Sequence, residues 1–102
     1  MKKIINGKKY DTETAKKIDC AYSMYLKTSF SYWEETLYQK RNGEFFLYGE
    51  GGPSSKYSVH VSENEWYGGE KIIPLTEQEA KQWAEKHMSV DKYEEIFGEV
   101  EE

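Results

Sequence analysis

The stretch that decides the fold is residues 35–48, Glu35-Thr36-Leu37-Tyr38-Gln39-Lys40-Arg41-Asn42-Gly43-Glu44-Phe45-Phe46-Leu47-Tyr48. Residues 35–40 and 44–48 are both rich in residues that favour strands. Between them lies Arg41-Asn42-Gly43, in which Asn or Gly readily takes the left-handed conformation that a short hairpin turn requires. The stretch therefore predicts an antiparallel hairpin.

Alternation of side chains along this hairpin gives it two apolar faces, because successive residues of a strand point to opposite sides. One face carries Leu37, Phe45 and Leu47, and the other carries Tyr38, Phe46 and Tyr48. We expect one face to lie against helices, and the other to be partly exposed or to contact another chain.

Upstream of this hairpin, the sequence predicts a smaller hairpin followed by a helix. Asn6-Gly7 joins two short pieces that suit strands, and both residues tolerate positive φ. Asp11 or Thr12 can cap a helix, and apolar residues follow at helical spacing at Ala15, Ile18, Tyr22 and Tyr25. Cys20 falls inside this predicted helix, and residues 27–33 are expected to form a loop.

Downstream of the hairpin, two further strands are predicted. Residues 56–62 alternate as a third strand should, with Tyr57, Val59 and Val61 on one side. Residues 62–69 are expected to form a loop that carries Trp66 and Tyr67. Residues 71–75 are expected to form a short strand. Because Pro74 has no backbone N–H, this strand should either end at Pro74 or lie at the edge of a sheet.

Two helices are expected to complete the chain. Thr76 and Glu79 have the spacing of a capping box, and the helix that follows them has an apolar stripe that includes Trp83. A second helix is predicted from about residue 90 to residue 97, with Gly98 ending it.

The order of these elements predicts an α+β fold, an antiparallel sheet of three to five strands packed by two or three helices on one side. With 102 residues the chain has the length of one domain. We assign residues 1–98 to this domain and residues 99–102 to an acidic C-terminal tail. Aromatic residues make up 16% of the chain. Their large side chains can bury enough apolar surface to form a core, although the chain has few aliphatic residues.

Charge and hydropathy narrow the class of partner. The formal charge of −5 is uneven, because residues 1–51 carry +2 and residues 52–102 carry −7. Binding to nucleic acid through its phosphates needs clustered Lys and Arg, so no direct nucleic-acid partner is expected. An acidic surface suits a basic groove on another protein. No apolar run approaches the length of a membrane helix, and a signal peptide is not evident, so we expect a cytoplasmic protein without membrane contact.

Motifs for catalysis or cofactor binding are incomplete. The glycine-rich stretch 49–56 lacks the spacing of a phosphate-binding loop and leads into a strand. His60, His87 and Cys20 do not have the spacing of a zinc site, and the pairs Glu34-Glu35 and Glu94-Glu95 are expected to be solvated. We therefore expect no metal, no cofactor and no enzymatic activity.

The surplus of aromatic residues is the remaining signal. A core of this size cannot bury all of them, and aromatic side chains exposed on loops are enriched in protein interfaces. The alternative is local packing that fastens loops to the sheet. We predict that a partner is bound by four aromatic residues and four acidic residues near them, namely Tyr48, Tyr57, Trp66 and Tyr67 with Glu50, Glu63, Glu65 and Glu70.

Three stretches carry a family resemblance, namely residues 3–15, residues 35–53, and residues 71–97 with their Ile-Ile-Pro-Leu-Thr start. Together they resemble a group of small acidic proteins carried on mobile elements of Firmicutes. Some proteins similar to this group are type II-A anti-CRISPR inhibitors, which block the Cas9 nuclease by binding it. The resemblance implies a non-enzymatic inhibitor that binds Cas9 or its guide-RNA complex and blocks DNA binding or cleavage. The alternative is an interaction module with another target, such as a conjugation or restriction factor, that can also self-associate.

Overall fold

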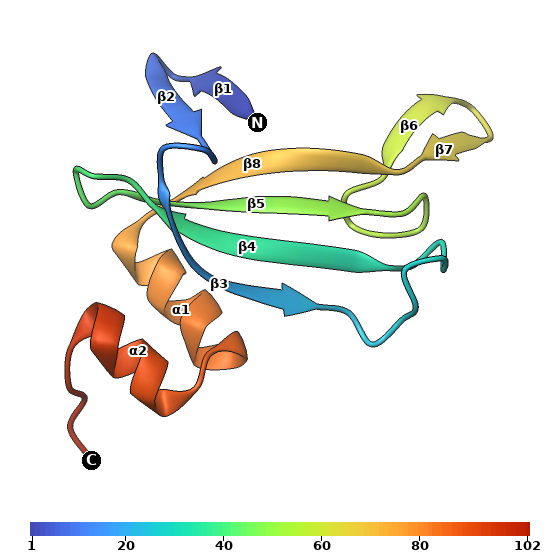
Figure 1. The fold of residues 1–102 in the computed structure, drawn as a ribbon. Helices are drawn as coiled ribbons and strands as arrows, with labels where there is room; N and C mark the ends of the chain where they lie inside the picture. Colours follow the sequence, from blue (N-terminus) through green and yellow to red (C-terminus); the bar gives the residue numbers. More distant parts are fainter.

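The computed structural model describes all residues, 1–102, and contains eight strands and two helices. Their bounds are β1 (Lys2–Ile5), β2 (Lys8–Asp11), β3 (Lys16–Tyr22), β4 (Trp33–Gln39), β5 (Phe45–Gly51), β6 (Val59–Ser62), β7 (Glu65–Tyr67), β8 (Gly69–Leu75), α1 (Glu77–His87) and α2 (Val90–Phe97). The predicted α+β class is confirmed, with a sheet packed against two helices (Figure 1).

The centre of the fold is a four-stranded antiparallel sheet in the order β3-β4-β5-β8. The hairpin predicted from residues 35–48 forms its two inner strands, and Leu37 pairs with Leu47. Gly43 has a φ of 92° in the connecting turn, which explains why a glycine stands there. Pro74 lies in β8 at the edge of the sheet, as predicted, where a missing N–H leaves no gap between strands.

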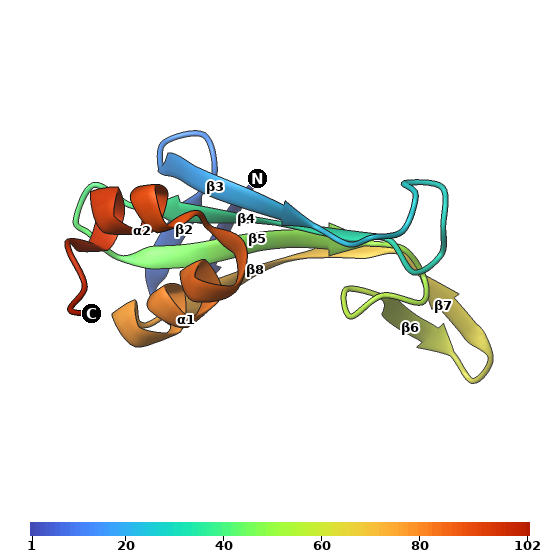
Figure 2. The same ribbon diagram turned by 90° about the horizontal axis from the view of Figure 1, so that it is seen from below.

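Helices α1 and α2 cover one face of this sheet (Figure 2). Leu37, Phe45 and Leu47 are buried against Ala80 and Trp83 of α1. The predicted capping box is present, because the Thr76 side chain accepts from the Glu79 backbone and the Glu79 carboxylate accepts from that of Thr76. The second helix also ends at Gly98, as expected.

The N-terminal hairpin β1–β2 covers part of the opposite face. Tyr10 packs edge-on against Phe46 at 5.4 Å between ring centroids, and Ile72 completes a second small core. Asn6 and Gly7 form the turn with positive φ angles of 51° and 78°, as the sequence predicts. The second face of the sheet is therefore covered near this hairpin by the chain itself.

The helix predicted after Asp11 and Thr12 is wrong, because residues 16–22 form strand β3. The register against β4 shifts between Lys17 and Asp19, which marks a β-bulge. The extra residue places Ile18 and Ala21 on the same face, where both are buried in the main core. A bulged strand can thus reproduce the three-residue apolar spacing that usually indicates a helix.

Residues 56–69 also differ from the prediction. Only Val59–Ser62 of the predicted third strand is extended, and it pairs with β7 in a separate two-stranded sheet. The stretch predicted as a loop, residues 62–69, contains β7 and the turn of this hairpin. All seven residues of β6 and β7 are exposed, so the hairpin projects from the fold and contributes nothing to the core.

The main core predicts a large difference between two identical substitutions. Leu37 is 0% exposed and Leu26 is 78% exposed. Leu37→Ala should lower the free energy of unfolding by about 2–5 kcal/mol, because it removes buried methyl groups and leaves a cavity. Leu26→Ala should change it by less than about 0.5 kcal/mol. Urea denaturation followed by circular dichroism measures both, and equal effects would place Leu37 outside the core.

Candidate functional site

Large apolar side chains are exposed together at one end of the sheet. Two segments project there, the β3–β4 loop and the β6–β7 hairpin, at the end of the sheet remote from α2 and the N-terminal hairpin (Figures 1 and 2). We name this region the apolar end. It consists of Tyr22, Met24, Tyr25, Leu26 and Phe30 near the loop and Val59, Val61, Trp66 and Tyr67 on the hairpin.

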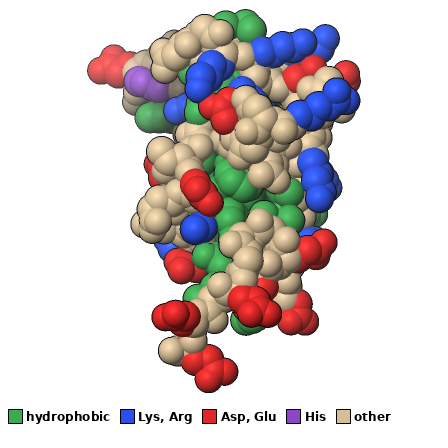
Figure 3. Space-filling model, turned by 90° about the vertical axis from the view of Figure 1, so that its left-hand side faces the viewer, with side chains coloured by type: hydrophobic (Ala, Val, Ile, Leu, Met, Phe, Trp, Pro, Cys, Tyr) green, Lys and Arg blue, Asp and Glu red, His purple; other side chains and the backbone are tan.

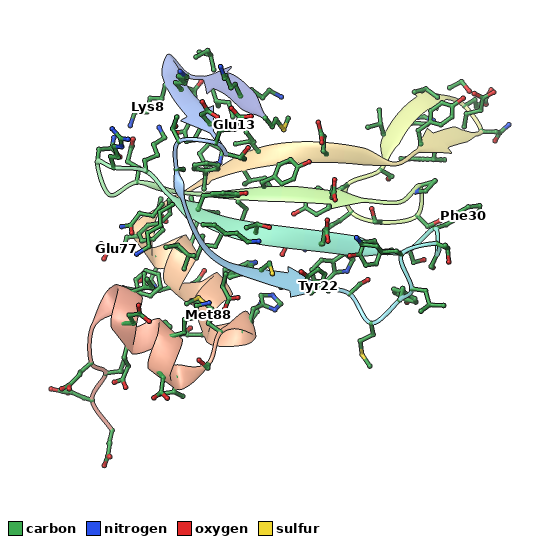
Figure 4. All side chains as sticks on the ribbon, in the orientation of Figure 1. Lys8, Glu13, Tyr22, Phe30, Glu77 and Met88 are labelled. Atoms are coloured by element: carbon green, nitrogen blue, oxygen red, sulfur yellow. The ribbon has the colours of Figure 1, made fainter.

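The β3–β4 loop holds its apolar side chains outward through its own backbone contacts. The Ser23 amide donates to the Trp33 carbonyl at 2.9 Å, and the Ser29 amide donates to the Leu26 carbonyl at 2.8 Å. Met24 is fully exposed and Phe30 is 70% exposed. Figure 4 shows Tyr22 and Phe30 at this end of the molecule. These side chains contribute no core contact, so burial within the fold does not account for them.

The β6–β7 hairpin presents an aromatic pair. His60 stacks on Trp66 with ring centroids 4.3 Å apart, and Trp66 is still 52% exposed. Tyr67 donates to Glu65 at 3.4 Å within the same strand. The hairpin thus offers stiff aromatic side chains, of the kind that is enriched in protein interfaces, next to a carboxylate.

The connection between β5 and β6 joins the two projecting segments. The Gly52 amide donates to the Tyr32 carbonyl and the Ser54 amide donates to the Phe30 carbonyl, both at 2.8 Å. A Cβ atom added to Gly52 would lie 2.5 Å from the Phe30 carbonyl oxygen, so this close approach requires glycine. The β3–β4 loop is therefore fixed to the connection that leads into the β6–β7 hairpin.

A buried carboxylate anchors the same connection to the sheet. Glu35 is 3% exposed and accepts hydrogen bonds from Trp83 Nε1 at 3.0 Å and from the Tyr57 hydroxyl. Lys56 Nζ lies 2.7 Å from the Glu35 carboxylate and over the Trp33 ring. The expectation that Glu34 and Glu35 form a solvated pair is thus wrong for Glu35, which joins β4, α1 and the loop before β6.

The charge on Glu35 is set by these contacts. Burial raises the pKa of Glu35, but hydrogen bonds from Lys56, Tyr57 and Trp83 outweigh it and hold the pKa below its ordinary value. Burial and the bond to Glu35 raise the pKa of the Tyr57 hydroxyl. The carboxylate is therefore ionised and the phenol neutral at physiological pH, which is the pairing that the hydrogen bonds require.

On the opposite face, three carboxylates form a row across the sheet. Glu34, Glu50 and Glu70 are neighbours in register on β4, β5 and β8. The Tyr48 hydroxyl lies within hydrogen-bond distance of both Glu70 and Glu50, and Tyr32 donates to Glu34 at 2.8 Å. An open hollow of about 600 Å³ lies beside Glu50 and Glu70, with Lys27 among its lining residues.

The pKa values of Glu34 and Glu50 in this row shift in opposite directions. Hydrogen bonding with Glu34, together with burial, raises the pKa of Glu50, and the same hydrogen bond lowers the pKa of Glu34. Burial and the bond to Glu34 raise the pKa of Tyr32 to about 12. The row remains an acidic, tyrosine-lined surface adjoining the apolar end.

The structure divides the eight predicted partner-binding residues into three places. Glu63, Glu65, Trp66 and Tyr67 lie on the projecting hairpin, and Tyr48, Glu50 and Glu70 lie in and beside the acidic row. Tyr57 is 6% exposed, with its ring directly over Gly49, so it belongs to the core and offers no surface to a partner.

The loop predicted at residues 27–33 is confirmed up to residue 32, but the exposed apolar side chains of the β3–β4 loop were not predicted as a surface. Residues 22–30 were divided between a helix and a loop, although Met24, Leu26 and Phe30 in a short polar stretch are an available signal for an exposed apolar segment. Assigning Tyr22 and Tyr25 to a helical stripe concealed it, because both were then expected to face a core.

The residues considered for metal binding and nucleophilic catalysis lie in separate places. His60 is on the hairpin, His87 packs against Trp83 at the end of α1, and Cys20 contacts the Tyr22 hydroxyl on β3. No group of three His, Cys, Asp or Glu side chains is arranged to hold a metal ion.

Comparison with protein-family models, with curated proteins and with solved structures finds no match for this chain. Neither helix has the length and apolar character required to cross a bilayer. The surfaces described above are therefore the basis for any functional proposal.

The Glu35 network predicts a pH-dependent difference in stability. Glu35→Gln should lower the free energy of unfolding by about 1–3 kcal/mol at neutral pH, because the Lys56 charge loses its partner. Since the folded pKa is lowered, the stabilisation is present above the ordinary carboxyl range and is lost as pH falls through the lowered pKa. The difference in the free energy of unfolding between wild type and Glu35→Gln should therefore become smaller at acidic pH.

Urea titrations at neutral pH and at about pH 3 measure this difference. Glu63→Gln is the matched control, because Glu63 is exposed on the hairpin and makes no hydrogen bond or ion pair. If the difference in the free energy of unfolding between wild type and Glu35→Gln is the same at both pH values, the carboxylate charge does not stabilise the fold.

Proposed function

We propose that this chain is a non-enzymatic protein-binding domain that docks through the apolar end. The observation that carries the proposal is the exposure of nine large apolar side chains, from two segments far apart in sequence, at one end of the sheet. Large apolar side chains that gather at one end of a soluble protein mark interaction sites more often than singly scattered ones do.

The composition of the apolar end suits the centre of an interface. Trp66, Tyr67 and Phe30 are stiff aromatic side chains that lose little conformational freedom when a partner covers them. Backbone hydrogen bonds from Gly52 and Ser54 already hold the β3–β4 loop against the connection between β5 and β6. A partner therefore meets a largely prearranged surface, which lowers the entropic cost of binding.

The charges next to the apolar end favour a basic partner. Glu63 and Glu65 lie on the hairpin, and the row of Glu34, Glu50 and Glu70 adjoins it. A positively charged surface on the partner would speed encounter and orient the complex. RNA-guided nucleases hold nucleic acid in such a positively charged channel.

In its specific form, we propose inhibition of a type II-A Cas9 by binding to it or to its guide-RNA complex. Two arguments support this target: the resemblance of residues 3–15, 35–53 and 71–97 to small mobile-element proteins, and the charge complementarity just described. An interaction module directed at a conjugation or restriction factor is the alternative, and it would use the same surface.

The first experiment is target DNA cleavage by several type II-A Cas9 proteins with and without the purified chain. We expect loss of cleavage with at least one of them, and a complex that co-elutes with that nuclease. Full cleavage by every nuclease at excess inhibitor would exclude Cas9 as the target while leaving the apolar end open to another protein.

Variants of the apolar end test the docking surface itself. The triple change Met24→Ser, Leu26→Ser and Phe30→Ser should weaken inhibition more than about tenfold, because buried apolar anchors carry most of the energy of an interface. The melting temperature should stay within about 2 °C, since these side chains are exposed.

Ile4→Ser is the matched control, because Ile4 is an exposed apolar residue on the N-terminal hairpin at the other end of the sheet. Equal inhibition by the triple variant and the control would remove the β3–β4 loop from the interface.

The same exposed surface would also fit a second copy of the chain. Light scattering across a concentration series distinguishes the two cases. A dimer that the triple variant converts to a monomer would favour self-association over a different protein partner.

A further inference from the structure

A second surface of opposite charge lies at the other end of the sheet. Residues 1–17 and 40–44 contain eight basic and three acidic side chains, a formal charge of +5, whereas the rest of the chain carries −10. We name these two segments the basic end. In Figure 3, which faces this end, blue side chains lie mainly in the upper part and red ones surround the C-terminal tail below.

Contacts between the N-terminal hairpin and the β4–β5 turn bring the two segments together. Lys8 Nζ lies 2.6 Å from Glu44 Oε2, and Lys40 Nζ lies 3.8 Å from the centre of the Tyr10 ring. Lys17 pairs with Tyr38 in the sheet and so adds its charge on the same face. Positive side chains that are 30 or more residues apart in sequence thus meet on one surface.

A hollow of about 410 Å³ opens between these segments and is lined in part by Lys9, Thr14, Arg41 and Asn42. Neither Lys9 nor Arg41 makes an ion pair, and both are exposed. Their charged groups are therefore available to an anion, with the Thr14 hydroxyl and the Asn42 amide beside them as hydrogen-bonding groups.

Two of the three acidic residues of the basic end are already engaged, whereas Glu13 is exposed and forms no ion pair. Hydrogen bonds from Lys8, Asn42 and Lys40 lower the pKa of Glu44 to about 2. Asp11 also lines the hollow, but it is buried and accepts a hydrogen bond from the Glu13 amide at 2.9 Å. Lys9 and Arg41 are left without a carboxylate partner, so the surface keeps an excess of positive charge.

We propose that the basic end binds the phosphate backbone of a nucleic acid, with Lys9 and Arg41 as its principal contacts. Phosphates are recognised by Lys and Arg side chains together with neutral hydrogen-bond donors, and the fold brings both kinds of group together here. An acidic protein would require apolar anchors, and the only large apolar side chains exposed at this end are Met1 and Ile4. Neither of them lines the hollow.

The negative net charge of the chain does not prevent this binding. The molecule is 48 Å long, whereas the screening length at physiological salt is about 8 Å. The carboxylates at the far end are therefore largely screened from a strand at the basic end. The expectation of no nucleic-acid partner was based on the charge summed along the sequence. Helix α2 and the acidic C-terminal tail lie at the same end of the molecule as the basic segments, but on the opposite side of the sheet from the N-terminal hairpin (Figures 1 and 3).

This inference goes beyond the proposed docking function and does not depend on it. A protein that contacts a nuclease through its apolar end could hold a nucleic-acid strand at the opposite end. The two surfaces can be altered independently, so failure of one proposal leaves the other intact.

The test is fluorescence anisotropy with a labelled single strand of about 20 nucleotides, over a salt range of about 50 to about 200 mM. We expect binding at low salt that weakens steeply as salt rises. The double variant Lys9→Glu, Arg41→Glu should bind at least about tenfold more weakly, and the slope of log K against log salt should fall by about 1.4, since each lost phosphate contact removes about 0.7.

The matched control is Lys27→Glu, Lys71→Glu, which changes the net charge equally at the other end of the sheet. Neither lysine forms an ion pair, and this variant should bind within about threefold of wild type. Circular dichroism should show that both variants are folded.

Three results would overturn the proposal: no binding by the wild-type chain at low salt, an equal loss in the control variant, or unchanged binding in the double variant. Polyglutamate of matched charge is the competing ligand. Tighter binding to polyglutamate than to the nucleic acid would show that the surface serves an acidic protein instead.

Discussion

The side chain of Glu35 is the point at which the sheet, helix α1 and the connection to the projecting hairpin meet. Its carboxylate accepts hydrogen bonds from Trp83 of the helix and from Tyr57 of the loop before β6, and it forms an ion pair with Lys56 of the same loop. An ionised carboxylate in this position is costly unless every contact is present, so the network forms as a unit or not at all. Because Gly52 and Ser54 of the same connection also bond to the β3–β4 loop, the contacts of this buried charge help to position that loop.

Local signals in the sequence were sufficient for most elements of the fold. The Asn6-Gly7 turn, the central hairpin and the capping box at Thr76 each depend on neighbouring residues, and each is present. Strand β3 was mistaken for a helix because its bulge places Ile18 and Ala21 on one face. A bulge is fixed by pairing with a distant strand, and the spacing of apolar residues alone does not reveal it.

The candidate surfaces were harder to predict for the same reason. The acidic row consists of residues 34, 50 and 70, which become neighbours only through the register of three strands. Glu35 was expected to be solvated like Glu34, but alternate residues of a strand face opposite sides, and one side is the helix-covered core. Tyr57 was expected at the surface, and only the tertiary structure shows that its ring covers Gly49.

Separation of charge and apolar surface along the sheet connects these observations. One end of the molecule carries exposed aromatic side chains and carboxylates. The other end carries unpaired lysine and arginine on one side of the sheet and the acidic helix α2 and C-terminal tail on the opposite side (Figures 1 and 3). A single surface of mixed charge would bind weakly to many partners, whereas two separated surfaces can each be complementary to a different one. The four-stranded sheet holds these surfaces at a fixed distance, since its strands run from one end to the other (Figure 1). The sheet therefore holds the two proposed binding surfaces at a fixed separation, and the stability of the fold would maintain that separation when a partner binds.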